Sequence, residues 1–123
     1  MIINIGSLSS AVPLKEFSIY GATKRFVEFF SRAVAYEVKE AITLVTFLPG
    51  NTNTNQTLQE GFKEDSNSCI STQEFVSAAL NELNSGYTAG HRDHKLEMLG
   101  ISLLPTALAS KISYAINNYS KKF

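Results

Sequence analysis

Tryptophan is absent from this chain of 123 residues, cysteine occurs once and proline three times, and 11 basic side chains balance 11 acidic ones. The single cysteine, Cys69, excludes an internal disulfide framework and fits a reducing compartment, so we expect a cytoplasmic protein. Without a basic excess, the chain lacks the charge for binding nucleic acid through phosphate contacts. No apolar run reaches the roughly 20 residues of a membrane span.

The length suits one compact domain, and its first half has the pattern of an α/β protein. Residues 2–5 (IINI) are a short β-branched run that ends at Gly6, and residues 41–48 (AITLVTFL) are a continuous apolar, β-rich run that ends at Pro49-Gly50. Such runs are typical of strands buried in a parallel sheet. Between them, residues 19–39 have the spacing of a long helix, so the three segments predict a βαβ unit.

The predicted helix is amphipathic. We expect its apolar stripe to be core or a dimer face, and its charged residues, Glu28 included, to occupy the other positions. The stripe consists of Ala22, Phe26, Phe29, Phe30, Ala33 and Val34.

The rest of the chain predicts shorter elements. Segment 51–68 is polar and aperiodic, which indicates a long loop. Ser71 and Glu74 have the spacing of a capping box for a helix over 72–83. Residues 86–90 predict a short third strand, and the tail from residue 95 predicts two amphipathic helices, interrupted by Gly100 and Pro105.

Three side chains in the βαβ unit suit catalysis. Tyr20 and Lys24 lie four residues apart and share a helix face, while Ser7 follows the first strand. Ligands of open parallel sheets bind at the carboxyl ends of the strands, where these groups can converge. A neighbouring ammonium lowers the pKa of a phenol, and a serine hydroxyl can donate to an oxygen that gains negative charge.

The same residues resemble a known active site. The order Ser7, then Tyr20-Gly21-Ala22-Thr23-Lys24, then the segment Pro49-Gly50-Asn51-Thr52-Asn53-Thr54 resembles the Ser, Tyr-x-x-x-Lys and Pro-Gly motifs of the short-chain dehydrogenase/reductase family. Alone, Ser7 would suit a turn and the Tyr–Lys pair a solvated helix surface; three motifs in order favour the catalytic interpretation. The resemblance implies an α/β fold, specifically the C-terminal half of a Rossmann-type doubly wound parallel sheet over residues 1–123.

The resemblance also implies roles for individual residues. Tyr20 would be the catalytic acid/base, Lys24 would lower its pKa and bind the nicotinamide ribose, and Ser7 would polarise a substrate carbonyl. The cofactor would be NAD(P), with NADP(H) slightly favoured. The nicotinamide would be flanked by Pro49, Gly50, Thr52 and Thr54, beside Tyr20 and Lys24.

One family element has no counterpart here. No G-x-G-x-x-G or G-x-x-x-G-x-G occurs in the chain, so nothing in it matches the loop that binds a dinucleotide pyrophosphate. We therefore expect the catalytic half of an oxidoreductase, without the N-terminal cofactor-binding half and inactive alone. The alternative is a non-catalytic remnant that acts as an interaction module.

The helix around Tyr20 is most similar to very-long-chain 3-oxoacyl-CoA reductases, 17β-hydroxysteroid dehydrogenases and bacterial short-chain dehydrogenases. This implies a small carbonyl or alcohol substrate, apolar acyl or steroid-like, and a homodimer through the helix containing Tyr20 and Lys24. The eukaryotic subgroup would place the protein at the endoplasmic reticulum membrane instead. His91 and His94 lack a third ligand at convincing spacing, so we expect a solvated turn and no metal.

Overall fold

The computed structural model describes residues 1–38, 41–59 and 69–120. Its centre is a parallel sheet in the order β1 (Ile2–Ile5), β2 (Leu44–Phe47) and β3 (Tyr87–Thr88). β1 pairs with β2 from Ile2 opposite Leu44 to Ile5 opposite Phe47. The predicted α/β class is confirmed, with the small parallel sheet and helices of a partial Rossmann-like fold.

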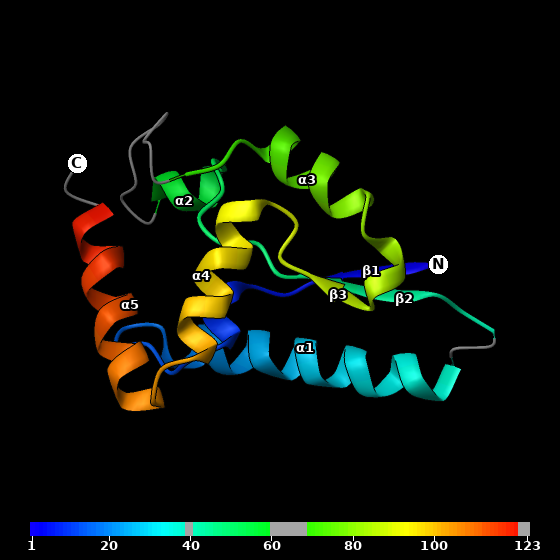
Figure 1. Ribbon diagram of the computed structural model, residues 1–123, viewed down its shortest axis with the longest axis horizontal. Coiled ribbons are helices and arrows are strands. Elements are labelled where there is room, and N and C mark those ends of the chain that lie inside the picture. Colours follow the sequence, from blue (N-terminus) through cyan, green and yellow to red (C-terminus); the bar gives the residue numbers. More distant parts are fainter. Residues whose placement is uncertain (39–40, 60–68, 121–123) are drawn as a thin grey trace.

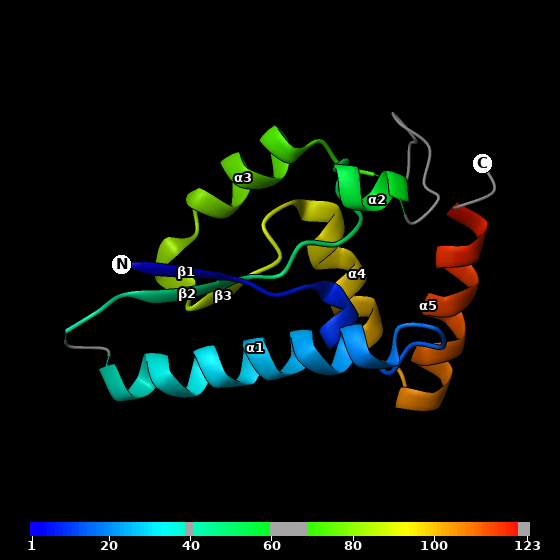
Figure 2. The same ribbon diagram turned by 180° about the vertical axis from the view of Figure 1, so that it is seen from behind.

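Helices cover both faces of the sheet. α1 (Ser18–Val38) runs along one face and α3 (Thr72–Leu80) covers the other (Figures 1 and 2). α4 (Arg92–Ser102) and α5 (Thr106–Ser120) lie toward the carboxyl ends of the strands, near the short α2 (Asn55–Gln59). Within the described ranges, no helix is long and apolar enough to cross a membrane.

Two buried clusters hold these layers together. Val45 and Phe47 of β2 pack against Phe75 and Ala79 of α3. Leu8, Leu48 and Ala89 form the second cluster, against which Met98 of α4 packs. The second cluster lies beside the strand ends and fixes the start of each loop that follows them.

The buried face of α1 differs from the prediction. The helix buries two polar residues, Glu28 and Ser31, whereas Phe26, Phe29 and Phe30 are 68%, 53% and 54% exposed. Of the two expectations for these phenylalanines, a place in the core is wrong for this chain, and a place in a dimer face stays a prediction. Amphipathic spacing identifies two faces without saying which one meets the sheet. Here the face that bears Glu28 and Ser31 does, and the Asn4 amide of β1 donates to Ser31 Oγ at 2.7 Å.

Other boundaries also shift for identifiable reasons. The second strand begins at Leu44 rather than at residue 41, because the N–H groups of Ala41 and Ile42 bond to Val38 O at the end of α1. The predicted loop 51–68 contains α2, and its residues 60–68 lie outside the described part. The capping box is confirmed: Ser71 and Glu74 bond reciprocally at the start of α3, although that helix ends at Leu80 rather than residue 83.

Candidate active site

Ser7 occupies the turn that leaves β1. It is 6% exposed and caps the short 3₁₀-helix η1 (Leu8–Ser10), where its Oγ accepts the Ser9 N–H at 3.2 Å. A serine hydroxyl can accept and donate at once. Within the described residues, no acceptor binds the Ser7 hydroxyl hydrogen, so this donor can serve a ligand.

Tyr20 and Lys24 lie one helical turn apart on α1, on the side that faces the turn. Lys24 Nζ lies 5.6 Å from the centroid of the Tyr20 ring and donates to Ile5 O at 3.1 Å. Phe17 packs edge-on against Tyr20, with ring centroids 6.1 Å apart. The ammonium is thus held between the end of β1 and the phenol, and two of its three N–H donors stay available to other acceptors.

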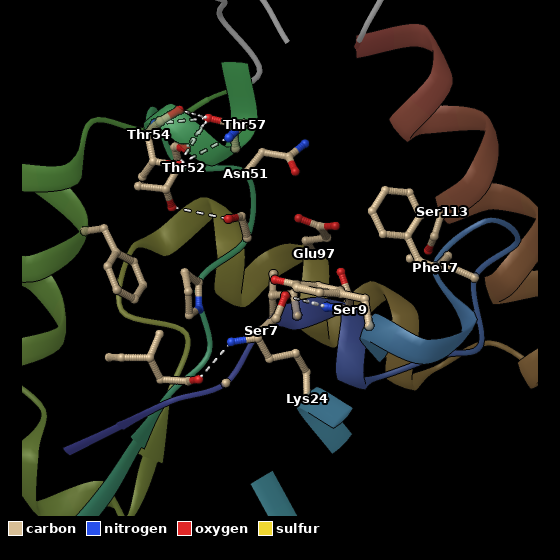
Figure 3. Close-up of a pocket in the computed structure, with 18 of the residues that line it drawn as sticks. Ser7, Ser9, Phe17, Lys24, Asn51, Thr52, Thr54, Thr57, Glu97 and Ser113 are labelled. Atoms are coloured by element: carbon tan, nitrogen blue, oxygen red, sulfur yellow. Dashed lines mark hydrogen bonds between the residues drawn. The ribbon is translucent and has the colours of Figure 1, made fainter. Parts of the chain in front are cut away.

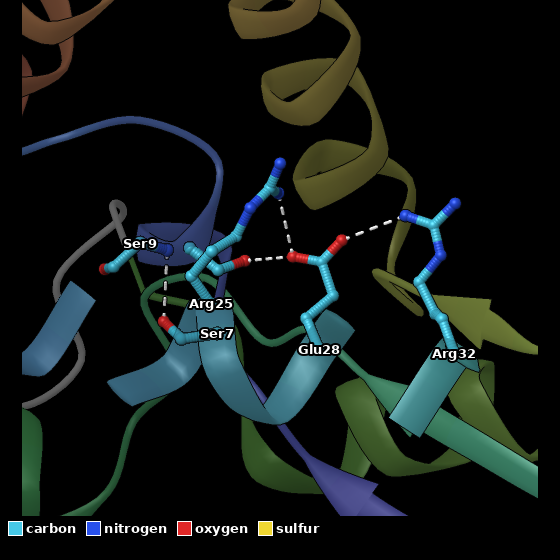
Figure 4. Close-up of polar contacts among 6 residues, drawn as sticks. Ser7, Ser9, Arg25, Glu28 and Arg32 are labelled. Carbon is cyan, nitrogen blue, oxygen red and sulfur yellow. Dashed lines mark hydrogen bonds and ion pairs between the residues drawn. The ribbon is translucent and has the colours of Figure 1, made fainter. Parts of the chain in front are cut away.

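A buried polar anchor holds the serine turn against α1 (Figure 4). Ser10 donates to Glu28 Oε2 at 2.6 Å, and Arg25 and Arg32 each approach a Glu28 oxygen to 3.2 Å. Glu28 is 4% exposed, so its carboxylate depends on these three partners. Glu28 follows Lys24 by one turn of helix, so one side of α1 bears the Tyr–Lys pair and fixes the turn of Ser7.

The segment after β2 forms another side of the site. Pro49 O accepts the Leu8 N–H at 2.9 Å, which joins this segment to the serine turn. Gly50 N–H donates to Nδ1 of His94 at 3.2 Å, while Thr52 donates to Gly50 O at 3.2 Å. Burial lowers the pKa of His94, which favours the neutral ring that this acceptor role requires.

These groups line one pocket of about 300 Å³ at the carboxyl ends of the strands (Figure 3). Every residue predicted for the site lies on its wall: Ser7, Tyr20, Lys24, Pro49, Gly50, Thr52 and Thr54. Elements distant in sequence complete it, with Phe75 from α3, Glu97 and Ile101 from α4, and Ser113 and Ile116 from α5.

Sequence reasoning missed Glu97. Its carboxylate points into the cavity (Figure 3), and the side chain is exposed to solvent. The surrounding protein atoms nevertheless raise the pKa of this carboxyl by desolvation. Only the packing of α4 across the strand ends reveals this position, because nothing in the local sequence distinguishes Glu97 from a surface glutamate.

The histidine pair also differs from the prediction of a solvated turn. His91 caps α4 by accepting the Asp93 N–H, but His94 is 4% exposed and packs on Phe75. The alternation of polar and apolar residues around them does not reveal this burial. Within the described residues, no group of three histidine, cysteine or acidic side chains is arranged to hold a metal ion.

The comparisons with known proteins agree on one family. The sequence profile of the family described as short chain dehydrogenase matches residues 1–65, a range that includes all seven predicted site residues. No solved structure gives a significant match.

The curated relatives are oxidoreductases by name. The provisionally named steroid dehydrogenase 2 of Caenorhabditis elegans is 32% identical over 115 residues, which cover 85% of this chain and 33% of the relative. The very-long-chain 3-oxoacyl-CoA reductase let-767 of Caenorhabditis briggsae is 30% identical over 91% of this chain and 35% of its own length. The 17-beta-hydroxysteroid dehydrogenase type 3 of Danio rerio is 29% identical over 86% of this chain and 34% of its own length. The chain thus spans about a third of the length of these relatives.

Proposed function

The chain belongs to the short-chain dehydrogenase family of oxidoreductases, and from this premise we propose that it contributes the catalytic half of an NAD(P)-dependent enzyme that interconverts a carbonyl and an alcohol. The observation that carries the proposal is the single pocket shared by Ser7, Tyr20, Lys24 and the segment 49–54. The dinucleotide, when bound, supplies or accepts the hydride. The side chains of this chain position the substrate and move the proton.

Each polar group has a role consistent with its contacts. Tyr20 donates its phenolic proton to the carbonyl oxygen in reduction and takes it back in oxidation. Lys24, 5.6 Å from that ring, stabilises the negative charge that develops on the phenol oxygen. Ser7, whose hydroxyl hydrogen has no acceptor among the described residues, donates it to the same carbonyl oxygen.

The residues present fit the nicotinamide end of the cofactor. The segment that bears Pro49, Gly50, Thr52 and Thr54 offers backbone and hydroxyl groups, and Lys24 retains N–H donors for a ribose. The segment lies tightly against α4, since a Cβ on Gly50 would come within 2.6 Å of the His94 ring. We propose NAD(P) as the cofactor, with NADP(H) slightly favoured.

The sequence contains no glycine-rich loop of the kind that holds the adenosine and pyrophosphate end of a dinucleotide. Residues 1–123 are therefore proposed to form the catalytic part of a larger cofactor-binding domain and to be inactive alone. The mass of the native polypeptide that carries these residues tests this point. A species of 13.5 kDa with no associated partner contradicts it.

Replacing Tyr20 by phenylalanine tests the chemistry. In the larger polypeptide that carries these residues, we expect Tyr20→Phe to nearly abolish turnover, measured as oxidation of the reduced nicotinamide. Cofactor affinity should stay largely unchanged, because the ring stays and only the proton donor is lost. Tyr36→Phe is the matched control, since Tyr36 is 77% exposed on the same helix. Retained turnover in Tyr20→Phe would refute the assignment of the acid/base.

The exposed face of α1 supports a homodimer as the assembly. Phe26 and Phe30 stack with centroids 5.7 Å apart, and Arg25 lies 3.9 Å above the Phe29 ring. We propose that this face pairs with a second copy, which would cover aromatic surface that the chain itself leaves open. Light scattering should give twice the protomer mass, and Phe26→Ser should reduce it to the protomer mass. An unchanged mass in the variant would contradict the pairing.

The substrate is proposed to be a small apolar carbonyl or alcohol compound, of the steroid or 3-oxoacyl classes that the names of the relatives contain. The apolar side chains of Phe17, Ile101 and Ile116 on the pocket wall suit such a body.

A further inference from the structure

The pocket contains two charged side chains of opposite sign, Lys24 and Glu97. Lys24 has a partner, because its ammonium donates to Ile5 O. Glu97 has neither a hydrogen bond nor an ion pair with any described residue. By contrast, the carboxylates of Glu28, Glu74 and Glu82 all accept hydrogen bonds from neighbouring side chains.

Glu97 has an unusual position for a carboxylate without a partner. It lies on α4, on the pocket wall, with its oxygens directed into the cavity that also contains Ser7, Tyr20 and Lys24 (Figure 3). The side chain is exposed to solvent on one side, while the protein atoms around it partly desolvate its carboxyl and raise the pKa of that group. A partly desolvated polar group without a partner is costly, and a ligand that donates a hydrogen bond to it removes that cost.

The consequences differ between ligand classes. A ligand that places a carboxylate or phosphate beside Glu97 would meet a like charge. A plain alkyl chain in contact with Glu97 would displace the remaining water from its carboxylate without replacing the lost hydrogen bonds. A hydroxyl or ammonium group would donate to the carboxylate and form a charge-assisted hydrogen bond.

We propose that Glu97 selects the substrate: the pocket takes a carbonyl or alcohol compound with an apolar body and a second, hydrogen-bond-donating hydroxyl or amino group, which binds Glu97 while the reacting carbon lies at Ser7 and Tyr20. This inference rests on the proposed function and narrows its substrate class. It disfavours a simple alkyl chain and an anionic ligand at this position. Phe17 and Ile101 give the pocket wall an apolar part that suits the body of such a ligand.

A matched ligand series tests the selection. Acetophenones with a para-methyl, para-hydroxymethyl, para-aminomethyl or para-carboxylate group share one skeleton and one carbonyl. Their dissociation constants for the purified protein are measured by titration calorimetry, without turnover. We expect the hydroxymethyl and aminomethyl compounds to bind at least about tenfold more tightly than the methyl compound, the order expected for one hydrogen bond to a charged group, and the carboxylate to bind most weakly.

Glu97→Gln should abolish the preference for the ammonium and improve binding of the carboxylate. Glu37→Gln removes the same charge from an exposed position on α1 and should leave the series unchanged. An unchanged ligand order in Glu97→Gln, or no binding of any probe to the unsubstituted protein, would overturn the proposal. Turnover is measured separately, with reduced nicotinamide cofactor, in the larger polypeptide that carries these residues. If binding follows Glu97 but that polypeptide reduces no member of the series, the proposed function fails while the ligand selection stands.

Discussion

Glu28 offers the sharpest test of how the serine turn is held. Its carboxylate is 4% exposed and bonds the Ser10 hydroxyl, Arg25 and Arg32. The perturbation is Glu28→Ala, with Glu28→Gln as the variant that keeps an acceptor for Ser10 but removes the charge. The two substitutions separate the hydrogen bond from the ion pairs.

The expected loss can be worked out from the three contacts. Glu28→Ala leaves the buried Ser10 hydroxyl without its acceptor, which costs about 1–3 kcal/mol. The arginine side chains are 44% and 38% exposed and can regain water, so each pair contributes about 0–1 kcal/mol. We therefore expect Glu28→Ala to lower the free energy of unfolding by roughly 3 kcal/mol and Glu28→Gln by roughly 1 kcal/mol.

Urea unfolding followed by far-ultraviolet circular dichroism measures both variants. With a slope of about 1–3 kcal/mol per molar urea, the alanine variant should lower the midpoint by about 1–3 M. Glu37→Ala, at an exposed position of the same helix, should change the unfolding free energy by less than about 0.5 kcal/mol. The reasoning is refuted if Glu28→Ala stays within that limit, or if the glutamine variant loses as much as the alanine variant.

Three further predictions concern the loop beside the pocket and α4. Burial lowers the pKa of His94, so the unfolded chain takes up a proton near pH 6.5 before the native protein does, and this part of the stability is present above that pH and lost below it. When the free energy of unfolding is measured against pH, His94→Gln should lose less stability on acidification than the unsubstituted protein. Glu97, whose raised pKa changes stability in the opposite direction, is present in both proteins and does not affect their difference. Gly50→Ala should destabilise the protein in thermal unfolding, because a Cβ would lie 2.6 Å from the buried His94 ring. Gly100→Ala should instead raise stability by about 0.5–1 kcal/mol, because a Cβ there meets nothing within 4 Å on α4; a lower melting temperature would contradict this.

Local chemistry made much of the fold predictable. The strand predicted over residues 2–5 has the same bounds as β1, because a run with three β-branched residues is followed directly by Gly6. The Ser71–Glu74 spacing predicted the start of α3 because a capping box satisfies the first N–H groups of a helix within four residues. The pocket brings together Ser7, Tyr20 and Lys24, because parallel strands direct their following loops to one edge.

The burial of Glu28 and His94 and the position of Glu97 depend on tertiary packing and could not be predicted from the sequence. Glu28 looks like a solvated helix residue until Arg25, Arg32 and Ser10 surround it. His94 is buried and Glu97 lines the pocket only because α4 folds back across the strand ends. The Arg25 and Arg32 pairs follow from helical spacing, but the burial of Glu28 depends on Ser10, which lies on another element. The positions of His94 and Glu97 likewise depend on neighbours distant in the sequence, which local periodicity does not reveal.

The contacts that α1 makes with the rest of the protein require a fixed number of residues between them. Tyr20, Lys24, Glu28 and Ser31 follow at intervals of three or four residues and meet, in turn, the pocket, the end of β1, the serine turn and Asn4. Inserting or deleting one residue between Tyr20 and Ser31 would rotate everything beyond it by about 100° and shift it by about 1.5 Å. No single readjustment restores all four contacts, so length variation among related sequences should occur in the loops and never inside this stretch.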